Sequence, residues 1–424
     1  MESTPGLSGF RRLGGELHCG EVPLEELARR YGTPLYVYDL ALVGENVRRF
    51  RTAFSGVPFT LAYSVKANGN LSVLNRLASL GTGADIVSAG ELHRCLQAGI
   101  RPRDIYFAGV GKRPEEVERA LEAGIGAFHV ESAHELAVLA KVAEEKDLRA
   151  PLAIRVNPDI HSPTFHEYTR TGHAASKFGV PASEALELYR RANEHEHLAV
   201  RGVDVHIGSQ IMDPDPYMEA WRTVRGLLRL LRDEGMKLEY VDLGGGFGVG
   251  YRGEPGLDLD FLAEALVPQV QAEGLELILE PGRSVVGEAG VLVVQVLHVK
   301  RSGGTVFVVA DGGMTELLRP SHYGGFHAVE PVVKRDHRPV EPVDLVGPIC
   351  ESGDFLARDR ELAVPEPGEL LAVRTAGAYG FSMASNYNAR RRPAEVVVDG
   401  TRVHLARPRE SYSDLVRGET LPDW

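Results

Sequence analysis

The chain has 424 residues, of which 43% are hydrophobic and 25% are charged, a composition typical of soluble globular proteins. This length exceeds what one ordinary hydrophobic core accommodates, so two domains are expected. The formal net charge of -12 argues against a nucleic-acid or anionic-membrane partner, because both require clustered cations.

The cysteines and the amino terminus indicate a cytoplasmic location. Cys19, Cys95 and Cys350 are odd in number and far apart, which favours reduced thiols over a disulfide framework. No apolar run approaches the length of a membrane span, and the first 20 residues lack the apolar core of a signal peptide. We therefore expect a cytoplasmic protein without a membrane partner, and we predict no metal site.

The first predicted elements lie outside any regular pattern. A strand-like stretch at 16–22 is followed by a helix at 24–31, and a short strand at 34–38 is followed by a helix at 40–54.

From residue 59 onward, apolar β-rich runs alternate with amphipathic helical patterns. The predicted strands are 59–65, 84–87, 105–108, 127–130, 152–156, 203–207, 240–243 and 275–279. The predicted helices include 91–99, 114–124, 133–145, 182–193, 217–234 and 259–273. This alternation is typical of a closed parallel (β/α)8 barrel of the TIM type, whose active site lies at the carboxyl ends of the strands.

Polar residues and glycines gather in or just after the ends of these predicted strands. They are Lys66, Asp85, Glu131, Arg155, Asn157, His206, Ser209, Gly244, Gly245, Gly246, Glu280 and Arg283. Each alone has a structural explanation: a lone lysine is usually solvated, a histidine buried in the core, and an aspartate a helix cap. Their coincidence at one face of the barrel instead favours an active site.

Beyond residue 284 the helical pattern stops, and β-rich runs occur between glycines and prolines. They lie at 291–299, 305–310, 343–346, 370–374 and 395–405, the last with a hairpin signal at Asp399-Gly400. We predict a second, all-β domain, similar to a β-barrel or sandwich and completed by the amino-terminal segment. The expected domains are residues 37–285, and residues 1–36 with 286–424.

The residue types at the strand ends suggest a cofactor. A lysine can form an imine with an aldehyde when desolvation or neighbouring charge lowers its pKa. The triple glycine from Gly244 to Gly246 lets backbone N–H groups approach a phosphate, although alone it also suits a tight turn. Glu280 could hold a ring nitrogen in its protonated form, and Arg283 could bind a carboxylate. An aldehyde, a phosphate and a basic ring nitrogen together describe pyridoxal 5′-phosphate.

Several motifs in order extend this interpretation over nearly the whole chain. They are YSVKAN at 63–68, HIGS at 206–209, GGGFG at 244–248, EPGR at 280–283, MTELLRP at 314–320, CESGD at 350–354 and GAYGFSM at 377–383. With these motifs the sequence resembles the fold type III pyridoxal-phosphate-dependent decarboxylases. The resemblance implies decarboxylation of meso-2,6-diaminopimelate to L-lysine and carbon dioxide, the last step of lysine biosynthesis.

The resemblance also implies roles for individual residues. Lys66 would hold the cofactor, His206 would stack on its ring, and Glu280 would pair with the ring nitrogen. The remaining cofactor-binding residues would be Asp85, Ser209, Gly244, Gly245, Gly246, Pro281, Gly282, Arg283 and Tyr379. The substrate would be held by Arg283, Arg319, Tyr323, Glu351 and Tyr379. Cys350 would return a proton after carbon dioxide leaves, and in this family it is supplied by the partner subunit of a homodimer with shared active sites.

Three alternatives stay open from the residues. A decarboxylase of another basic amino acid, such as ornithine, lysine or arginine, would bind a distal amine, whereas Arg283, Arg319 and Tyr323 suit a distal carboxylate. A racemase of similar fold usually places arginine where Glu280 stands. A protein that binds the cofactor without catalysis would be expected to lack Lys66 or Cys350.

Overall fold

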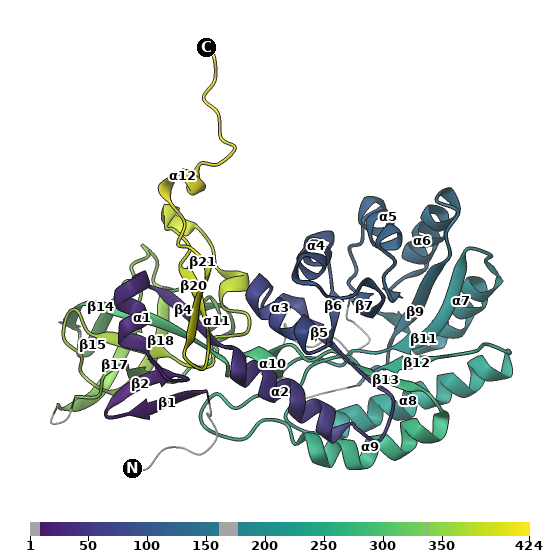
Figure 1. Ribbon diagram of the computed structural model, residues 1–424, viewed down its shortest axis with the longest axis horizontal. Coiled ribbons are helices and arrows are strands. Elements are labelled where there is room, and N and C mark those ends of the chain that lie inside the picture. Colours follow the sequence, from purple (N-terminus) through teal and green to yellow (C-terminus); the bar gives the residue numbers. More distant parts are fainter. Residues whose placement is uncertain (1–8, 161–176, 336–337) are drawn as a thin grey trace. The chain divides into compact units, whose positions relative to one another are not determined.

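The computed structural model describes residues 9–160, 177–335 and 338–424 (Figure 1). The chain divides into two compact units. The barrel unit consists of residues 44–249 and 255–285, and the β unit consists of residues 1–43, 250–254 and 286–424. Residues 1–8 of the predicted β-domain lie outside the described residues.

Eight parallel strands of the described barrel unit close into a barrel. Hydrogen-bonded neighbours follow the order β5-β6-β7-β8-β9-β11-β12-β13, and β13 pairs back with β5. The strands are β5 (Phe59–Ser64), β6 (Gly83–Ile86), β7 (Ile105–Phe107), β8 (Ala127–Val130), β9 (Ala150–Asn157), β11 (Leu198–Asp204), β12 (Tyr240–Asp242) and β13 (Glu276–Leu279), with the short β10 (Val180–Pro181) beside β9. The predicted (β/α)8 barrel is confirmed.

Helices follow the barrel strands and surround them (Figure 1). They are α3 (Leu71–Ser79), α4 (Ala89–Ala98), α5 (Pro114–Ala123), α6 (Ala133–Glu145), α7 (Ala182–Glu194), α8 (Asp215–Asp233) and α9 (Leu259–Glu273); α2 (Leu40–Ala53) and α10 (Arg283–Val286) connect the units in sequence. Side-chain oxygens of Ser88, Ser132 and Asp258 accept backbone N–H groups in the first turns of α4, α6 and α9. Such caps fix where each helix starts after its loop, and thereby the length of the loops at the strand ends.

Two details at the strand ends differ from the prediction. The sequence predicts a strand at 203–207, whereas β11 spans Leu198–Asp204 and pairs along β9 from Leu198 onward. Arg201 and Gly202 interrupt the apolar residues of β11, so its first half lacks the longer apolar run that marks the other strands. β5 ends at Ser64, one residue before the predicted end, and Val65 joins Lys66 in a 3₁₀ turn (Val65–Ala67); Lys66 lies just after the strand, as predicted.

The β unit contains two sheets. One is antiparallel with the order β1-β2-β3, and the other has the order β18-β17-β15-β14-β4-β20-β21, with β19 on β14 and β16 on β19. The strands are β1 (Phe10–Leu13), β2 (Glu16–Cys19), β3 (Val22–Pro23), β4 (Leu35–Asp39), β14 (Gly290–Ser302), β15 (Thr305–Ala310), β16 (Val329–Pro331), β17 (Val340–Val346), β18 (Phe355–Ala363), β19 (Leu370–Val373), β20 (Ala394–Asp399) and β21 (Arg402–Arg407). The helices are α1 (Leu24–Tyr31), α11 (Arg319–Tyr323) and α12 (Tyr412–Leu415).

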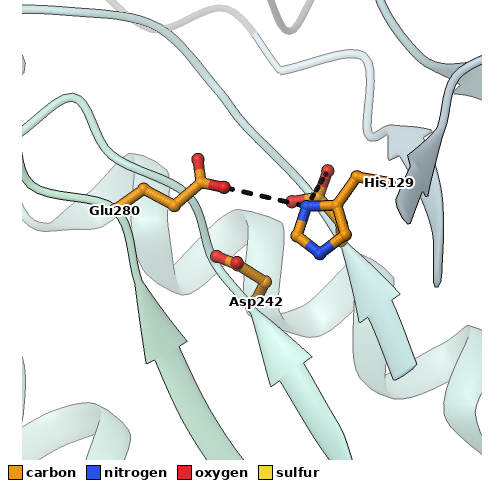
Figure 2. A group of neighbouring side chains, drawn as sticks. His129, Asp242 and Glu280 are labelled. Atoms are coloured by element: carbon orange, nitrogen blue, oxygen red, sulfur yellow. Dashed lines mark ion pairs between the residues drawn. The ribbon is translucent and has the colours of Figure 1, made fainter. Parts of the chain in front are cut away.

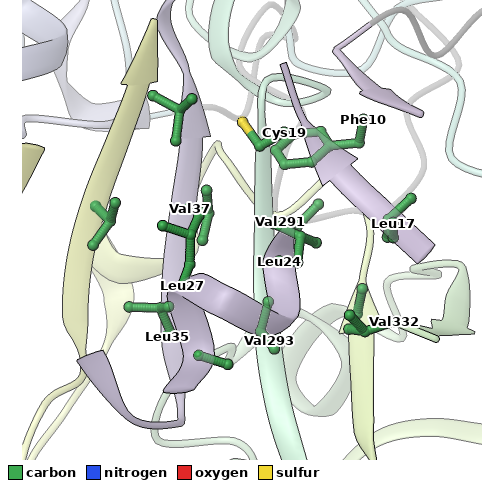
Figure 3. Packing of buried hydrophobic residues seen from close by; sticks show 14 of the residues in the cluster. Phe10, Leu17, Cys19, Leu24, Leu27, Leu35, Val37, Val291, Val293 and Val332 are labelled. Atoms are coloured by element: carbon green, nitrogen blue, oxygen red, sulfur yellow. The ribbon is translucent and has the colours of Figure 1, made fainter. Parts of the chain in front are cut away.

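Both ends of the sequence contribute to the core of the β unit (Figure 3). Amino-terminal side chains pack with side chains from beyond residue 290; the labelled members are Phe10, Leu17, Cys19, Leu24, Leu27, Leu35, Val37, Val291, Val293 and Val332. β4 lies between β14 and β20 in the large sheet. The amino-terminal segment therefore completes the β-domain, as the sequence predicts.

Several β-unit elements differ from the prediction. The stretch 16–22 forms two strands, β2 and β3, around a turn in which Gly20 has a φ of 57°. β1, β16 and β18 have no predicted counterpart, because these segments are short or polar; β1 and β18 pair with the adjacent strands β2 and β17, and β16 pairs with the more distant β19. Residue 37, the first of the predicted barrel domain, lies inside β4. The domain bounds 37–285 and 1–36 with 286–424 stay a prediction.

Among the described helices, none combines the length and the apolar character needed to cross a bilayer.

Candidate active site

A lysine and a carboxylate pair at the ends of the first two barrel strands. Lys66 Nζ donates a hydrogen bond to Asp85 Oδ2, and Ser64 Oγ donates to the same oxygen at 2.8 Å. The Asp85 side chain is fully buried, whereas that of Lys66 is 34% exposed. Burial alone would raise the pKa of Asp85, but the charge of Lys66 and the hydrogen bonds from Lys66 and Ser64 bring it below its usual value. Asp85 therefore stays ionised beside the Lys66 amine.

The triple glycine after β12 forms a turn that side chains would obstruct. Gly244 and Gly246 have φ values of 72° and 95°, in the region that favours glycine. A Cβ on Gly245 would lie 2.3 Å from the carbonyl oxygen of Glu280, closer than packed atoms approach. The loop thus depends on all three glycines.

The same loop orients His206, which follows β11. The Gly245 N–H donates to His206 Nδ1 at 3.1 Å, so this nitrogen is an acceptor. Burial, and then the positive charges of Arg155 and Lys66, lower the pKa of His206 to about 3. The imidazole is therefore neutral near pH 7 and presents an uncharged ring to the site.

Glu280, after β13, belongs to a buried group of titratable side chains. Figure 2 shows Glu280, Asp242 and His129 turned toward one another; Asp242 lies in β12, Glu280 follows the neighbouring strand β13, and His129 lies in β8. Potential ligand atoms of these residues and of Asp204 all lie within 4.8 Å of one another. His129 Nδ1 is 3.4 Å from Asp204 Oδ2 and 3.7 Å from Glu280 Oε1.

Burial decides which members of this group carry charge. It raises the pKa values of Asp204 and Asp242 well above their usual range and lowers that of His129 to about 4. Burial, and then the negative charge of Asp85, raise the pKa of Glu280 to about 7. The histidine is therefore uncharged near neutral pH, burial favours the protonated form of both aspartates, and the pKa of Glu280 lies where it can ionise.

Two further contacts join the predicted strand-end residues. Arg155 Nη1 lies 3.1 Å from Glu131 Oε1, and the same oxygen accepts the Gly109 N–H at 2.6 Å. Arg283 Nη2 donates to Ser209 Oγ at 3.0 Å, which joins the HIGS and EPGR motifs.

In the β unit, Arg319 lies in a buried arrangement of rings. Its Nη1 is 2.7 Å from His327 Nε2, and its guanidinium carbon lies 4.6 Å from the centre of the Tyr251 ring. His327 Nδ1 is in turn 2.8 Å from the carbonyl oxygen of Arg374. Arg319 and His327 are 6% and 0% exposed.

An aspartate of the loop that carries Cys350 holds the loop in place through hydrogen bonds to the backbone. Asp354 Oδ2 accepts the Ile349 N–H and Oδ1 accepts the Met314 N–H, both at 2.6 Å. Asp354 is buried, whereas Cys350 and Glu351 are exposed in this single chain. The loop therefore presents the thiol and the neighbouring carboxylate outward from a fixed base.

The structure brings most of the predicted strand-end residues into contact within the barrel unit, through the pairs described above. Asn157 is an exception, because its side chain caps the turn after β9 by accepting the Asp159 N–H. In the β unit, Tyr323 and Tyr379 are partly buried, and Tyr379 has a φ of 55°. The structure gives the positions of these residues, and their roles in the site stay a prediction.

Sequence reasoning missed the buried residues His129, Asp204 and Asp242, as well as His327. The signal for the first three is a polar residue inside an apolar strand, a position that is costly unless it is paired or functional.

The barrel unit has side chains of the kinds that pyridoxal 5′-phosphate requires. Lys66 offers a partly exposed amine, and Gly246, the partly exposed member of the triple glycine, brings backbone without a side chain to the loop after β12. Glu280 Oε1 is buried without a hydrogen-bond partner among the described residues, as expected if a donor outside the chain completes it. The residues present therefore fit the cofactor.

The family model for the pyridoxal-binding domain of pyridoxal-dependent decarboxylases matches residues 40–287. The chain belongs to this family, and its cofactor is pyridoxal 5′-phosphate. Its relatives include the diaminopimelate decarboxylase of Pseudomonas aeruginosa, 47% identical over 97% of this chain and 99% of the relative. The diaminopimelate decarboxylase of Vibrio cholerae is 44% identical over 95% of this chain and 96% of the relative.

Solved structures agree with this assignment. The diaminopimelate decarboxylase of Helicobacter pylori in complex with L-lysine superposes with a TM-score of 0.90 at 40% identity, covering 93% of this chain and 98% of that one. The enzyme of M. jannaschii, also in complex with L-lysine, gives a TM-score of 0.93 at 37% identity, with 98% of both chains covered.

Proposed function

We propose that this protein decarboxylates meso-2,6-diaminopimelate to L-lysine and carbon dioxide, the last step of lysine biosynthesis. The observation that carries the proposal is the Lys66–Asp85 pair at the carboxyl end of a closed parallel barrel. The relatives' activity and the lysine complexes of similar structures support the choice of substrate.

The barrel residues hold and tune the cofactor. When bound, pyridoxal phosphate supplies an electron sink for the pair left behind by carbon dioxide. Lys66 provides the amine for its aldehyde, and Asp85 keeps a negative charge beside that amine. Glu280 would carry the charge that keeps a ring nitrogen protonated, and neutral His206 would pack on the ring face. The phosphate would be held by Ser209, Gly244, Gly245, Gly246 and Tyr379, with Pro281, Gly282 and Arg283 forming the neighbouring turn.

The β-unit residues serve the substrate and the proton. Arg319, Tyr323 and Tyr379, together with Arg283 of the barrel unit, bind the distal carboxylate, and Glu351 binds the distal ammonium group. The Cys350 thiol gives its proton to the carbon that has lost carbon dioxide.

The working enzyme is a cytoplasmic homodimer with shared active sites. Cys350 and Glu351 are exposed in the single chain, on a loop with a rigid base, which suits residues offered to a partner subunit. The Cys350 thiol must stay reduced to donate a proton, and a reducing compartment ensures this.

Release of carbon dioxide tests the proposal. Protein loaded with the cofactor is incubated separately with meso-diaminopimelate, ornithine, lysine and arginine, and gas and products are measured. We expect diaminopimelate to react fastest. Borohydride treatment of the loaded protein should attach the cofactor to the peptide with Lys66 and not to that with Lys112, a buried lysine paired with Glu135. Faster release from ornithine, or label on another lysine, would contradict the proposal.

A further inference from the structure

The Arg319 side chain is held by two rings of the β unit. Its guanidinium lies over the Tyr251 ring, 4.6 Å from the ring centre, while Nη1 lies 2.7 Å from His327 Nε2. The rings of Tyr251 and His327 contact each other edge to face, with centroids 5.2 Å apart and planes at 79°. A face contact and an in-plane hydrogen bond together restrict both the tilt and the rotation of the guanidinium.

The partners of His327 determine its protonation. Nδ1 is 2.8 Å from the Arg374 carbonyl oxygen, which can only accept, so Nδ1 carries a proton. Nε2 is 2.7 Å from an arginine nitrogen, which can only donate, so Nε2 carries a lone pair. His327 is therefore a neutral imidazole in the Nδ1–H form, and its two bonds use both nitrogens.

The base of this arrangement is rigid. Arg374, whose carbonyl orients the His327 ring, directly follows β19. Its own N–H donates to the Ala328 carbonyl at 2.8 Å, so the backbone on both sides of His327 is tied together. His327 is fully buried, and its ring lacks room to turn. An arginine held in this way has lost its side-chain entropy on folding and does not lose it again when it binds a carboxylate.

We propose that His327 is a positioning residue for substrate recognition, which holds the Arg319 guanidinium in the orientation that receives the distal carboxylate of the substrate. The inference rests on the proposed function, which makes Arg319 a substrate ligand. It assigns His327 no contact with the substrate or the cofactor.

Three substitutions separate the two bonds of His327. His327→Gln keeps an acceptor near the position of Nε2, so it can still receive the Arg319 donor. His327→Asn keeps a donor near the position of Nδ1 for the Arg374 carbonyl and loses the acceptor for Arg319. His327→Leu loses both. The glutamine and asparagine variants therefore form a matched pair: glutamine keeps only the contact with Arg319, and asparagine keeps only the contact with the Arg374 carbonyl.

The readout is ligand binding to the cofactor-loaded protein by calorimetry. L-lysine keeps the distal carboxylate of diaminopimelate, whereas 1,5-diaminopentane lacks it. We expect the asparagine and leucine variants to bind L-lysine about tenfold more weakly, as loss of a hydrogen bond to a charged group implies, and the glutamine variant to stay within about threefold of the unaltered protein. Binding of 1,5-diaminopentane and affinity for the cofactor should stay unchanged in all three. In an Arg319→Ala background, His327→Asn should add no further loss.

Several results would overturn the inference. One is L-lysine binding by the asparagine and leucine variants equal to that of the unaltered protein. Another is equal weakening of L-lysine and 1,5-diaminopentane, which would indicate a purely structural role. If the unaltered protein releases no carbon dioxide from diaminopimelate and binds no L-lysine, the proposed function fails, and this inference fails with it.

Discussion

At the scale of single residues, burial makes the ionised form of the Glu280 side chain unfavourable in the absence of a ligand. Its pKa of about 7 in the folded chain exceeds the ordinary value of 4.5, chiefly because of burial and then because of the charge of Asp85. A carboxyl whose pKa is raised by folding contributes stability that is fully present below pH 4.5 and is lost as the pH rises through 7. A positively charged ring nitrogen beside Glu280 would reverse this loss.

Replacing Glu280 by glutamine should stabilise the cofactor-free protein at high pH. The two proteins should unfold at similar urea concentrations at pH 4, and the variant should gain about 2–3 kcal/mol in free energy of unfolding by pH 8. Urea titrations at several pH values measure this difference. Glu264→Gln, at an exposed position on α9, is the control and should leave the pH profile unchanged. Parallel profiles for the Glu280→Gln variant and the unaltered protein would contradict the argument.

At the scale of elements, the turn after β12 shows how closely backbone segments approach at the barrel mouth. A Cβ on Gly244 would lie 2.6 Å from the Val205 carbonyl oxygen, and one on Gly245 would lie 2.3 Å from that of Glu280. Val205 follows β11 and Glu280 follows β13, so the turn after β12 packs closely between the ends of its two neighbouring strands. Without side chains the turn fits this space, and the Gly245 N–H donates to His206 and holds its ring in place.

Gly245→Ala should therefore damage both stability and cofactor binding. Because the nearest atom is backbone, the clash has no flexible side chain to relieve it, and we expect a loss of about 1–3 kcal/mol in free energy of unfolding. Gly226→Ala is the matched control: it lies inside α8, and its Cβ would meet no atom within 4 Å. That change should stabilise by about 0.5–1 kcal/mol. Urea unfolding and titration with pyridoxal phosphate test both variants, and equal behaviour of the two would refute the role of the turn.

At the scale of the whole molecule, the proposed site draws on both units. Lys66, His206 and Glu280 belong to the barrel unit, whereas Arg319, Cys350 and Glu351 belong to the β unit. In the proposed homodimer, the cysteine loop of one subunit serves the barrel of the other. Two-fold symmetry makes this exchange reciprocal, so each dimer has two shared sites.

Mixing two inactive variants tests the shared sites. A Lys66→Ala chain and a Cys350→Ala chain are combined under conditions that permit subunit exchange. With shared sites, a heterodimer has one site carrying both changes and one carrying neither, so activity should return to about a quarter of the original level for random pairing. Each variant alone, treated in the same way, is the control. If the mixture stays inactive although heterodimers form, each site lies within a single chain.

The sequence by itself determined the alternation of strands and helices, and with it the barrel. Strands of four to eight apolar residues and amphipathic helices differ in period, so their order is visible along the chain. Because the carboxyl ends of parallel strands meet at one face, the strand-end residues Lys66, Asp85, Glu131, His206 and Glu280 could also be assigned to one site. The family motifs added candidate site residues in the β unit, and their roles stay a prediction.

Only the tertiary structure decided the partners of the buried polar groups. His129, Asp204 and Asp242 stand in apolar strands, and their neighbours depend on how the barrel closes and on which side chains its register turns inward. Arg319 and His327 are eight residues apart, yet the carbonyl that selects the His327 tautomer belongs to Arg374, 47 residues further along. Such contacts have no period in the sequence, because folding brings together side chains whose separation along the chain carries no information about their distance in space.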